Sequence, residues 1–347
     1  MLAVDIAAIL LLRRYRGLWA WCIVIGCAGV VALAFGGGLA GRYENHFGVI
    51  RLCAYGVLLH GTVLLAATAV LWRRCRPWLA CGAVLAAVAV IAVAADAFLI
   101  EPHWLEVSHR QIVSPKIHKP LRIVVLADLQ TDSIGPYERR VLQQTLEEKP
   151  DIILWAGDYL QSSWEGYKIL RRELRELLRE TEFTAPAGVF AVQGNCDPDG
   201  WEEIFEGSGA TVVGATQSFD LGDIQLTCLS MYESANPMLT LANESPDRFH
   251  LVLGHMPNFA LGKIDADLLV SGHTHGGQVR LPGIGPLMTL SRVPRAWAAG
   301  LTELPGGGKL LVSRGLGMER DYAPRIRFLC RPELMVIDLV PEEKSEQ

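Results

Sequence analysis

The stretch LRIVVLADLQTD, residues 121–132, sets the pattern from which the fold of this chain can be predicted. A short apolar run rich in β-branched residues is typical of a strand that is buried on both faces of a parallel sheet. The run ends at Asp128, and Gln130 follows two residues later. Because ligands gather beyond the carboxyl ends of parallel strands, we expect Asp128 to belong to a functional site at that edge of the sheet.

Four later apolar runs also end in a residue that can bind a metal ion. They are ILWAG before Asp158, FAVQG before Asn195, LVLG before His255, and LLVSG before His273, with His275 two residues further on. Between the first strands, residues 137–148 and 164–182 place apolar side chains at helical spacing. This alternation predicts an α/β domain, and the short Gly-punctuated runs after Gly209 predict a hairpin and a second sheet.

The residues at the strand ends provide two carboxylates, one amide and three imidazoles, which is more than a single tetrahedral zinc site uses. Such a set suits two divalent metal ions about 3.5 to 4 Å apart. Mixed nitrogen and oxygen ligands accept Mn, Fe, Zn or Mg, so the identity of the metal stays open. The alternatives are that Asp128 and Asp158 cap helices and that His255 is a hydrogen-bonded core residue.

The motifs ADLQ, GDY, GNCD, GHMP and GHTHGGQ resemble, in that order, the signature of the calcineurin-like metallophosphoesterases, written DxH, GD, GNH[DE], GH and GHxH. The segment GLGMERDYAPRIRFLCRPELMVIDL is similar to the end of the membrane-associated branch, which includes YkuE-like enzymes and UDP-2,3-diacylglucosamine pyrophosphatases. The resemblance implies an α/β fold, a four-layer α-β-β-α sandwich with two divalent metal ions. It also implies hydrolysis of a phosphodiester or diphosphate bond by metal-bound hydroxide.

The resemblance also implies a role for each residue of the motifs. Asp158 would bridge both metals. The first metal would be held by Asp128, Gln130 and His275, and the second by Asn195, His255 and His273. The residues expected to act in catalysis are Asn195, Cys196 and His255.

Two positions depart from the family pattern. Gln130 stands where the first motif has His, and Cys196 replaces the His of GNH[DE]. An amide oxygen is a hard, neutral ligand that suits Mn or Mg better than Zn, and whether Gln130 binds metal at all stays open. A thiol, with a pKa of about 8.5, is a weak acid, which favours leaving groups that depart as anions. These departures motivate an alternative, a degenerate domain that serves as a membrane-tethered binding or scaffolding module.

Residues 1–100 predict a membrane region. They contain eight basic and three acidic residues, and the rest of the chain is acidic. Three apolar stretches, at about 17–40, 52–72 and 77–100, reach the roughly 20 residues that a helix needs to span a bilayer. Arginines cluster at 13–16 and 73–76, which places these loops inside. We therefore expect a multi-pass protein of the inner (cell) membrane with its catalytic domain on the extracytoplasmic side.

The predicted domain organisation has four parts. They are a transmembrane region at 1–100, a linker or first edge strand at 101–120, a metallophosphoesterase domain at 121–341, and a tail at 342–347. The expected partners are the lipid bilayer and a phosphoester substrate, for which a lipid-linked compound is a candidate, and no nucleic acid. Cys196, Cys228 and Cys330 form no CxxC pair, so neither a zinc knuckle nor a disulfide framework is predicted.

Overall fold

The structure, a computed structural model, describes residues 2–14 and 46–342. The span predicted at 17–40 lies outside the described residues. The chain divides into two compact units, one formed by Met1–Ile100 with Asp321–Arg325 and the other by Glu101–Arg320 with Ile326–Gln347.

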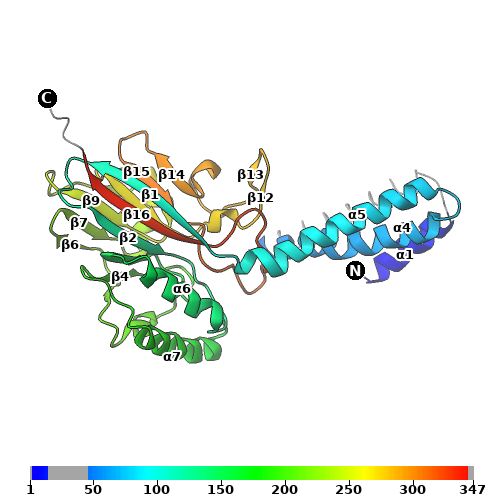
Figure 1. Cartoon of the computed structure of the whole chain (residues 1–347), viewed down its shortest axis with the longest axis horizontal. Helices are drawn as coiled ribbons and strands as arrows, with labels where there is room; N and C mark the ends of the chain where they lie inside the picture. The colour runs from blue at the N-terminus through cyan, green and yellow to red at the C-terminus, as the bar shows by residue number, and fades with distance from the viewer. Residues whose placement is uncertain (1, 15–45, 343–347) are drawn as a thin grey trace. The chain divides into compact units, whose positions relative to one another are not determined.

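The first unit is helical. Its described elements are α1 (Leu2–Arg14), α3 (His46–Tyr55), η1 (Gly56–His60), α4 (Gly61–Trp72), α5 (Pro77–Ala95) and η2 (Asp96–Ile100). Two continuous helices, Ile50–Trp72 with 23 residues and Pro77–His103 with 27, are long and apolar enough to cross a membrane, and α4 and α5 run side by side (Figure 1). Apolar residues such as Leu85 and Ile91 on α5 are exposed, as a lipid-facing helix requires. Their length and composition indicate an association with membranes.

The second unit contains two six-stranded mixed sheets. The first has the order β1 (Glu106–Ser114), β16 (Glu333–Pro341), β2 (Leu121–Leu126), β3 (Ile152–Trp155), β4 (Val189–Val192), β5 (Thr211–Val213). The second has the order β14 (Gly300–Glu303), β15 (Lys309–Val312), β11 (Leu268–Ser271), β9 (Phe249–Leu253), β7 (Ile224–Cys228), β6 (Gln217–Leu221). Strands β2 to β5 are parallel to one another, as are β7, β9, β11 and β15.

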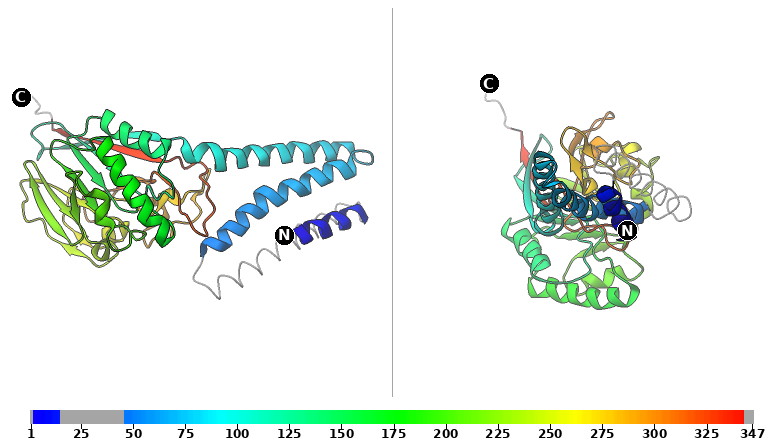
Figure 2. Two further views of the ribbon diagram at one scale, coloured as in Figure 1. Left: turned by 90° about the horizontal axis from the view of Figure 1, so that it is seen from below. Right: turned by 90° about the vertical axis from the view of Figure 1, so that its right-hand side faces the viewer.

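The facing surfaces of the two sheets form the central core. Leu154 of β3 and Leu251 of β9 belong to one fully buried apolar cluster. The outer face of the first sheet packs against α6 (Pro136–Glu147) and α7 (Trp164–Glu180), which contribute Leu142 and Leu174. Figure 2 shows both helices on the same side of the sheets. Both helices coincide with the predicted helical segments to within two residues.

The fourth layer of the predicted sandwich differs from expectation. Among the described residues, the outer face of the second sheet packs against η5 (Pro257–Leu261), which in turn contacts the short helix α8 (Met231–Ser234), and not against long α-helices. Phe259 of η5 and Val252 of β9 share a small buried cluster there. A smaller cover suffices because this cluster is smaller than the one beneath α6 and α7.

The segment 101–120 is also more structured than a linker. It contains η3 (Glu101–His103) and β1, which pairs in parallel with β16 along its whole length. Strand β1 is therefore the edge of the first sheet, the other interpretation offered by the sequence. The remaining short elements are η4 (Trp201–Phe205), β8 (Thr240–Leu241), β10 (Lys263–Ile264), η6 (His275–Gly277), β12 (Arg280–Leu281), β13 (Gly285–Pro286) and η7 (Arg295–Trp297).

Candidate metal centre

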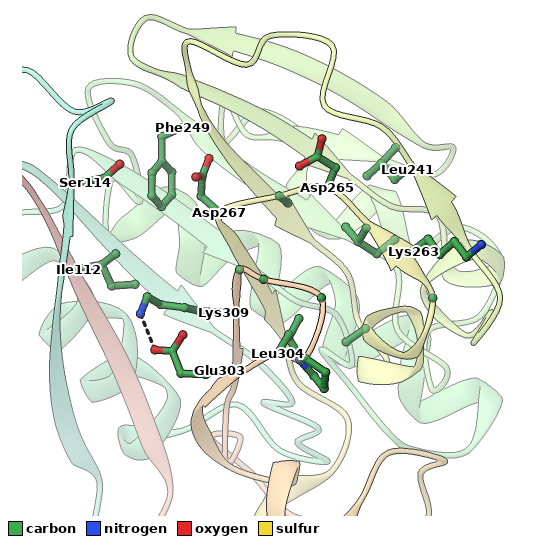
Figure 3. A pocket seen from close by; sticks show the side chains of 18 of the residues that line it. Ile112, Ser114, Leu241, Phe249, Lys263, Asp265, Asp267, Glu303, Leu304 and Lys309 are labelled. Carbon is green, nitrogen blue, oxygen red and sulfur yellow. Dashed lines mark hydrogen bonds and ion pairs between the residues drawn. The ribbon is translucent and has the colours of Figure 1, made fainter.

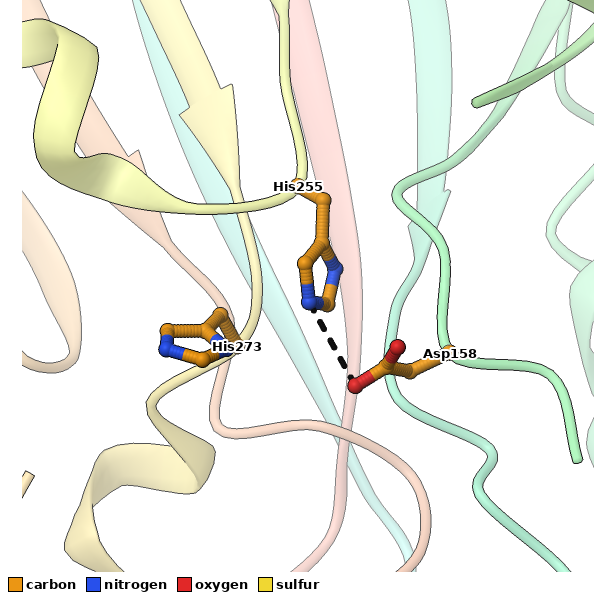
Figure 4. Close-up of side chains that lie close together, drawn as sticks. All are labelled: Asp158, His255 and His273. Atoms are coloured by element: carbon orange, nitrogen blue, oxygen red, sulfur yellow. Dashed lines mark ion pairs between the residues drawn. The ribbon is translucent and has the colours of Figure 1, made fainter. Parts of the chain in front are cut away.

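The predicted ligands meet where strands of both sheets end. Asp158 follows β3 of the first sheet, whereas His255 and His273 follow β9 and β11 of the second. Potential ligand atoms of these three residues all lie within 4.8 Å of one another, and Figure 4 shows the three side chains converging from separate loops. The two sheets therefore assemble one site from residues that are distant in sequence.

One half of the site centres on His255. Its Nε2 atom lies 3.3 Å from Oδ2 of Asp158 and 2.9 Å from Oδ1 of Asn195. Its Nδ1 atom lies 2.7 Å from the carbonyl oxygen of Ala156. When Nδ1 donates its proton to that carbonyl, Nε2 is left as the metal-binding nitrogen, which is the usual arrangement for a metal-bound His. The His273 ring completes this half, with its centroid 5.2 Å from that of His255.

The other three predicted ligands are Asp128, Gln130 and His275, and the structure brings Asp128 and His275 close to each other. Both carboxylate oxygens of Asp128 accept a hydrogen bond from the backbone N–H of His273, at 2.9 and 3.0 Å. A Cβ atom at Gly315 would lie 3.1 Å from Oδ2 of Asp128 and 3.2 Å from Nδ1 of His275. Asp128 and His275 thus line the same small space, which exists because residue 315 has no side chain.

Two atoms of this half fit a metal ion. Oε1 of Gln130 and Nδ1 of His275 are buried without a hydrogen-bond partner among the described residues. A buried polar atom left without a partner costs about 1–3 kcal/mol. Coordination of a cation would satisfy both atoms, so the residues present fit the metal that the sequence predicts.

The backbone at the predicted ligands is strained. Positive φ angles occur at Asp128 (50°), Gln130 (40°), Asp158 (56°), His273 (71°) and His275 (48°). Such angles are uncommon outside glycine and cost on the order of 1–3 kcal/mol each, and strain of this kind concentrates at functional sites. It persists here because the surrounding core strands and loops hold the chain in place.

Glycines allow the loops to approach the two aspartates. A Cβ atom at Gly194 would lie 2.1 Å from Oδ1 of Asp158, and one at Gly272 would lie 2.6 Å from Oδ2 of Asp128. Any larger residue would clash with these carboxylates. The glycine that precedes Asn195 and the glycine that precedes His273 therefore have a direct steric role.

The carboxylates and His255 shift each other's protonation. Burial raises the pKa of Asp128 to about 7, although the charge of His255 opposes this shift. Burial would also raise the pKa of Asp158, but the facing His255 outweighs it and lowers that pKa to about 2. Burial alone would lower the pKa of His255, which Asp158 and Asp128 instead raise to about 9. Without metal, a proton on His255 balances the buried negative charge.

The other two imidazoles are held neutral. Burial, followed by the charge of His255, lowers the pKa of His273 to about 4. Burial and then the charge of Arg327 hold the pKa of His275 well below its usual value. Since metals bind the neutral imidazole, both rings are in the ligand form at neutral pH.

Cys196 lies inside the site, as the sequence predicts. Its backbone N–H donates to Oδ1 of Asp158 at 2.7 Å. Its Sγ atom accepts hydrogen bonds from Nε2 of Gln130 at 3.1 Å and from Nδ2 of Asn195 at 3.3 Å. Burial, together with the charges of Asp158 and Glu319, raises the pKa of the thiol far above its usual value. The side chain therefore keeps its proton at neutral pH.

Asp197 was not among the predicted site residues. Its Oδ2 atom accepts from the backbone N–H groups of Asp158 at 2.7 Å and Gly194 at 2.8 Å, and its Oδ1 atom accepts from Tyr159 at 2.9 Å. Asp197 thereby ties the loop after β3 to the loop after β4. Its position as the last residue of GNCD was the available signal.

Glu319 and Arg327 also escaped prediction. Oε2 of Glu319 accepts a hydrogen bond from Nε2 of Gln130 at 3.2 Å. The fully buried guanidinium of Arg327 donates to backbone carbonyls that include those of Gly315 and Cys330, and so supports the loop beside Asp128. No spacing within the C-terminal segment identifies either residue.

A cavity of about 1030 Å³ lies elsewhere in the second unit (Figure 3). It is lined by residues that begin strands, such as Phe249 of β9 and Lys309 of β15. The predicted metal ligands His255 and His273 follow the opposite ends of strands β9 and β11, so the cavity is separate from the candidate metal centre. Two of its lysines form ion pairs within the cavity lining, Lys309 with Glu303 and Lys116 with Asp267.

Comparisons with known proteins agree with this geometry. Residues 121–277 match the family described as calcineurin-like phosphoesterase. The chain is 31% identical over 260 residues to the uncharacterized metallophosphoesterase YkuE of Bacillus subtilis, covering 69% of this chain and 87% of that protein. It is 29% identical over 263 residues to the phosphodiesterase YaeI of Escherichia coli, covering 69% and 90%. An uncharacterized metallophosphoesterase of Aquifex aeolicus is 25% identical over 258 residues, covering 69% and 94%.

Proposed function

The chain belongs to the calcineurin-like metallophosphoesterases, and from that premise we propose that it hydrolyses a phosphodiester or diphosphate bond in a lipid-linked substrate at a membrane. Membership of the family implies metal-dependent hydrolysis of a phosphoester. The observation that carries the proposal is the convergence of Asp158, His255 and His273 within 4.8 Å beside buried, unpartnered ligand atoms.

The two halves of the site would correspond to two metal positions. Asp158 would be shared between them. Asn195, His255 and His273 would hold one ion, and Asp128, Gln130 and His275 would hold the other. When bound, two divalent ions supply Lewis acidity to the phosphoryl group and a nucleophile at neutral pH.

The side chains around the site favour a particular leaving group. A thiol such as that of Cys196, with an ordinary pKa of about 8.5, is a weaker general acid at neutral pH than the imidazolium of the family pattern. Asn195 is exposed and is bonded to both Cys196 and His255, which places its amide where a substrate can reach it. A leaving group that departs as an anion, such as a phosphate released from a diphosphate, needs little protonation, which supports a diphosphate or activated diester over an alkyl monoester.

The rim of the site supports an amphipathic substrate. The backbone of Leu290 is hydrogen-bonded to the side chain of His273. The apolar side chains of Leu287, Met288 and Leu290 are 50%, 43% and 47% exposed. Apolar groups exposed beside a phosphate-binding site suit a substrate that carries a lipid part. The two long apolar helices support a membrane location, and the Arg clusters support an extracytoplasmic domain.

The second candidate function is a metal-binding domain that binds a phosphoester but does not hydrolyse it. The replacement of two family histidines by Gln130 and Cys196 is the observation that favours it. The other predicted ligands, Asp128, Asp158, Asn195, His255, His273 and His275, are all retained, which favours the enzyme.

The test uses the full-length protein in detergent micelles with Mn²⁺, Mg²⁺ or Zn²⁺. Hydrolysis of bis-p-nitrophenyl phosphate and of a UDP-linked glycolipid is measured for the wild type, His273→Ala and the control His118→Ala. His118 is exposed and pairs with Asp223, so its loss should leave the rate unchanged. Loss of a residue that only supports a metal ligand typically lowers activity by about 10- to 100-fold. We therefore expect His273→Ala, which removes a proposed ligand itself, to lower the rate by more than about 100-fold. A wild type that binds metal yet is as inert as His273→Ala would favour the binding module.

A further inference from the structure

The amide of Gln130 is held in one orientation. Its Nε2 atom donates to Oε2 of Glu319 at 3.2 Å and to Sγ of Cys196 at 3.1 Å. Its Oε1 atom is buried without a hydrogen-bond partner among the described residues. The reversed amide would place a carbonyl oxygen against a carboxylate, two acceptors facing each other. The carboxylate therefore selects the orientation in which Oε1 is the end left to bind a ligand.

Glu319 is itself fixed by a ring of hydrogen bonds. Its Oε1 atom accepts from Nε2 of Gln161 at 2.8 Å, and its backbone N–H donates to Oε1 of Gln278 at 3.1 Å. The neighbouring Arg320 donates its backbone N–H to Gln161 at 2.7 Å and its Nε–H to the carbonyl of Gln130 at 2.8 Å. The carboxylate is therefore tied to the same loop as the amide that it orients.

This arrangement has a known chemical counterpart. A metal-bound His usually donates its second N–H to a carboxylate, which fixes the ring and makes its free nitrogen a better ligand. An amide that donates N–H to a carboxylate is polarised in the same sense, so that negative charge increases on its oxygen.

We propose that Glu319 positions Gln130 as a ligand of the first metal ion, through Oε1, in place of an imidazole. The inference rests on the proposed two-metal site. The oxygen ligand favours hard cations such as Mn²⁺ over Zn²⁺ at this half of the site. Glu319 acts through Gln130 and does not itself touch the metal.

Mn²⁺ titration of the full-length protein in micelles, with free Mn²⁺ followed by electron paramagnetic resonance, tests the proposal. The wild type should bind two ions. Glu319→Ala should weaken one of them by about 10- to 100-fold, and Gln130→Ala should weaken the same ion at least as much. The double variant should bind no more weakly than Gln130→Ala, and Glu319→Gln, which keeps an acceptor oxygen, should retain part of the affinity. His273→Ala should weaken the other ion.

The controls separate this inference from the function on which it rests. Glu303→Ala, which removes an exposed carboxylate paired with Lys309, should leave both affinities unchanged. Melting of the metal-free variants reports folding, and Glu319→Gln carries the test if Glu319→Ala does not fold. A loss in Glu319→Ala that persists undiminished in the Gln130→Ala background would overturn the proposal, because Glu319 would then act independently. Unchanged affinity in Glu319→Ala with two bound ions would also overturn it, whereas a wild type that binds no metal would overturn the two-metal site as well.

Discussion

Asp197→Ala should lower the free energy of unfolding more than the removal of an exposed carboxylate does. The side chain is 4% exposed and accepts hydrogen bonds from the buried backbone N–H groups of Asp158, Tyr159 and Gly194. Each buried donor left without an acceptor costs about 1–3 kcal/mol, so the loss of all three predicts about 3–9 kcal/mol, with the lower end reached if water fills the space. Asp197→Asn keeps one acceptor oxygen, which can serve two of the donors, and should cost about 1–3 kcal/mol.

The assay is urea denaturation of the metal-free, full-length protein in micelles, followed by tryptophan fluorescence. Trp155 and Trp201 are buried around Tyr159 in the second unit, and they report on the unfolding of that unit. Asp220→Ala is the matched control, because Asp220 is exposed and pairs with Arg248. Such a surface pair contributes little to stability. If Asp197→Ala and Asp220→Ala unfold at the same urea concentration, Asp197 does not hold the two loops together.

Three further predictions concern the ligands and the membrane region. Gly315→Ala should lower the metal content measured by mass spectrometry, because the added Cβ would lie 2.9 Å from Cβ of Asp128 at a φ of 71°. Gly209→Ala, where the space is open, is the control. Equal metal content in the two variants would contradict the steric argument. In the metal-free protein, the raised pKa of His255 contributes stability that is complete below pH 6.5 and is lost as the pH rises through about 9. Melting temperatures measured across this range should show the loss. A His255→Gln protein with the same pH dependence would exclude His255 as its source. A reporter active only outside the cytoplasm, fused after Glu101, should be active, and a silent fusion would reverse the proposed orientation.

The sequence by itself was sufficient to predict the features that depend on residues close together in the chain. Buried strands such as Leu121–Leu126 follow from a short apolar run, and α7 follows from leucines at helical spacing. Most of the candidate ligands could be singled out because they stand at the end of such a strand, and parallel strands of one sheet bring their carboxyl ends to one edge. Local periodicity and strand direction therefore place Asp158 at an edge of the first sheet and His255 and His273 at an edge of the second, and the packing of the two sheets brings the three residues into one site.

Only the tertiary structure decided the features that depend on distant parts of the chain. Strand β1 mixes four exposed residues with three buried ones, and its place in the sheet depends on pairing with β16 more than 200 positions away. Glu319 meets Gln130 across 189 positions, a contact that no spacing rule encodes. The environment of Gln130 illustrates the difference: the sequence shows an amide where the family has an imidazole, but the direction in which its oxygen points is set by a carboxylate that folding brings beside it.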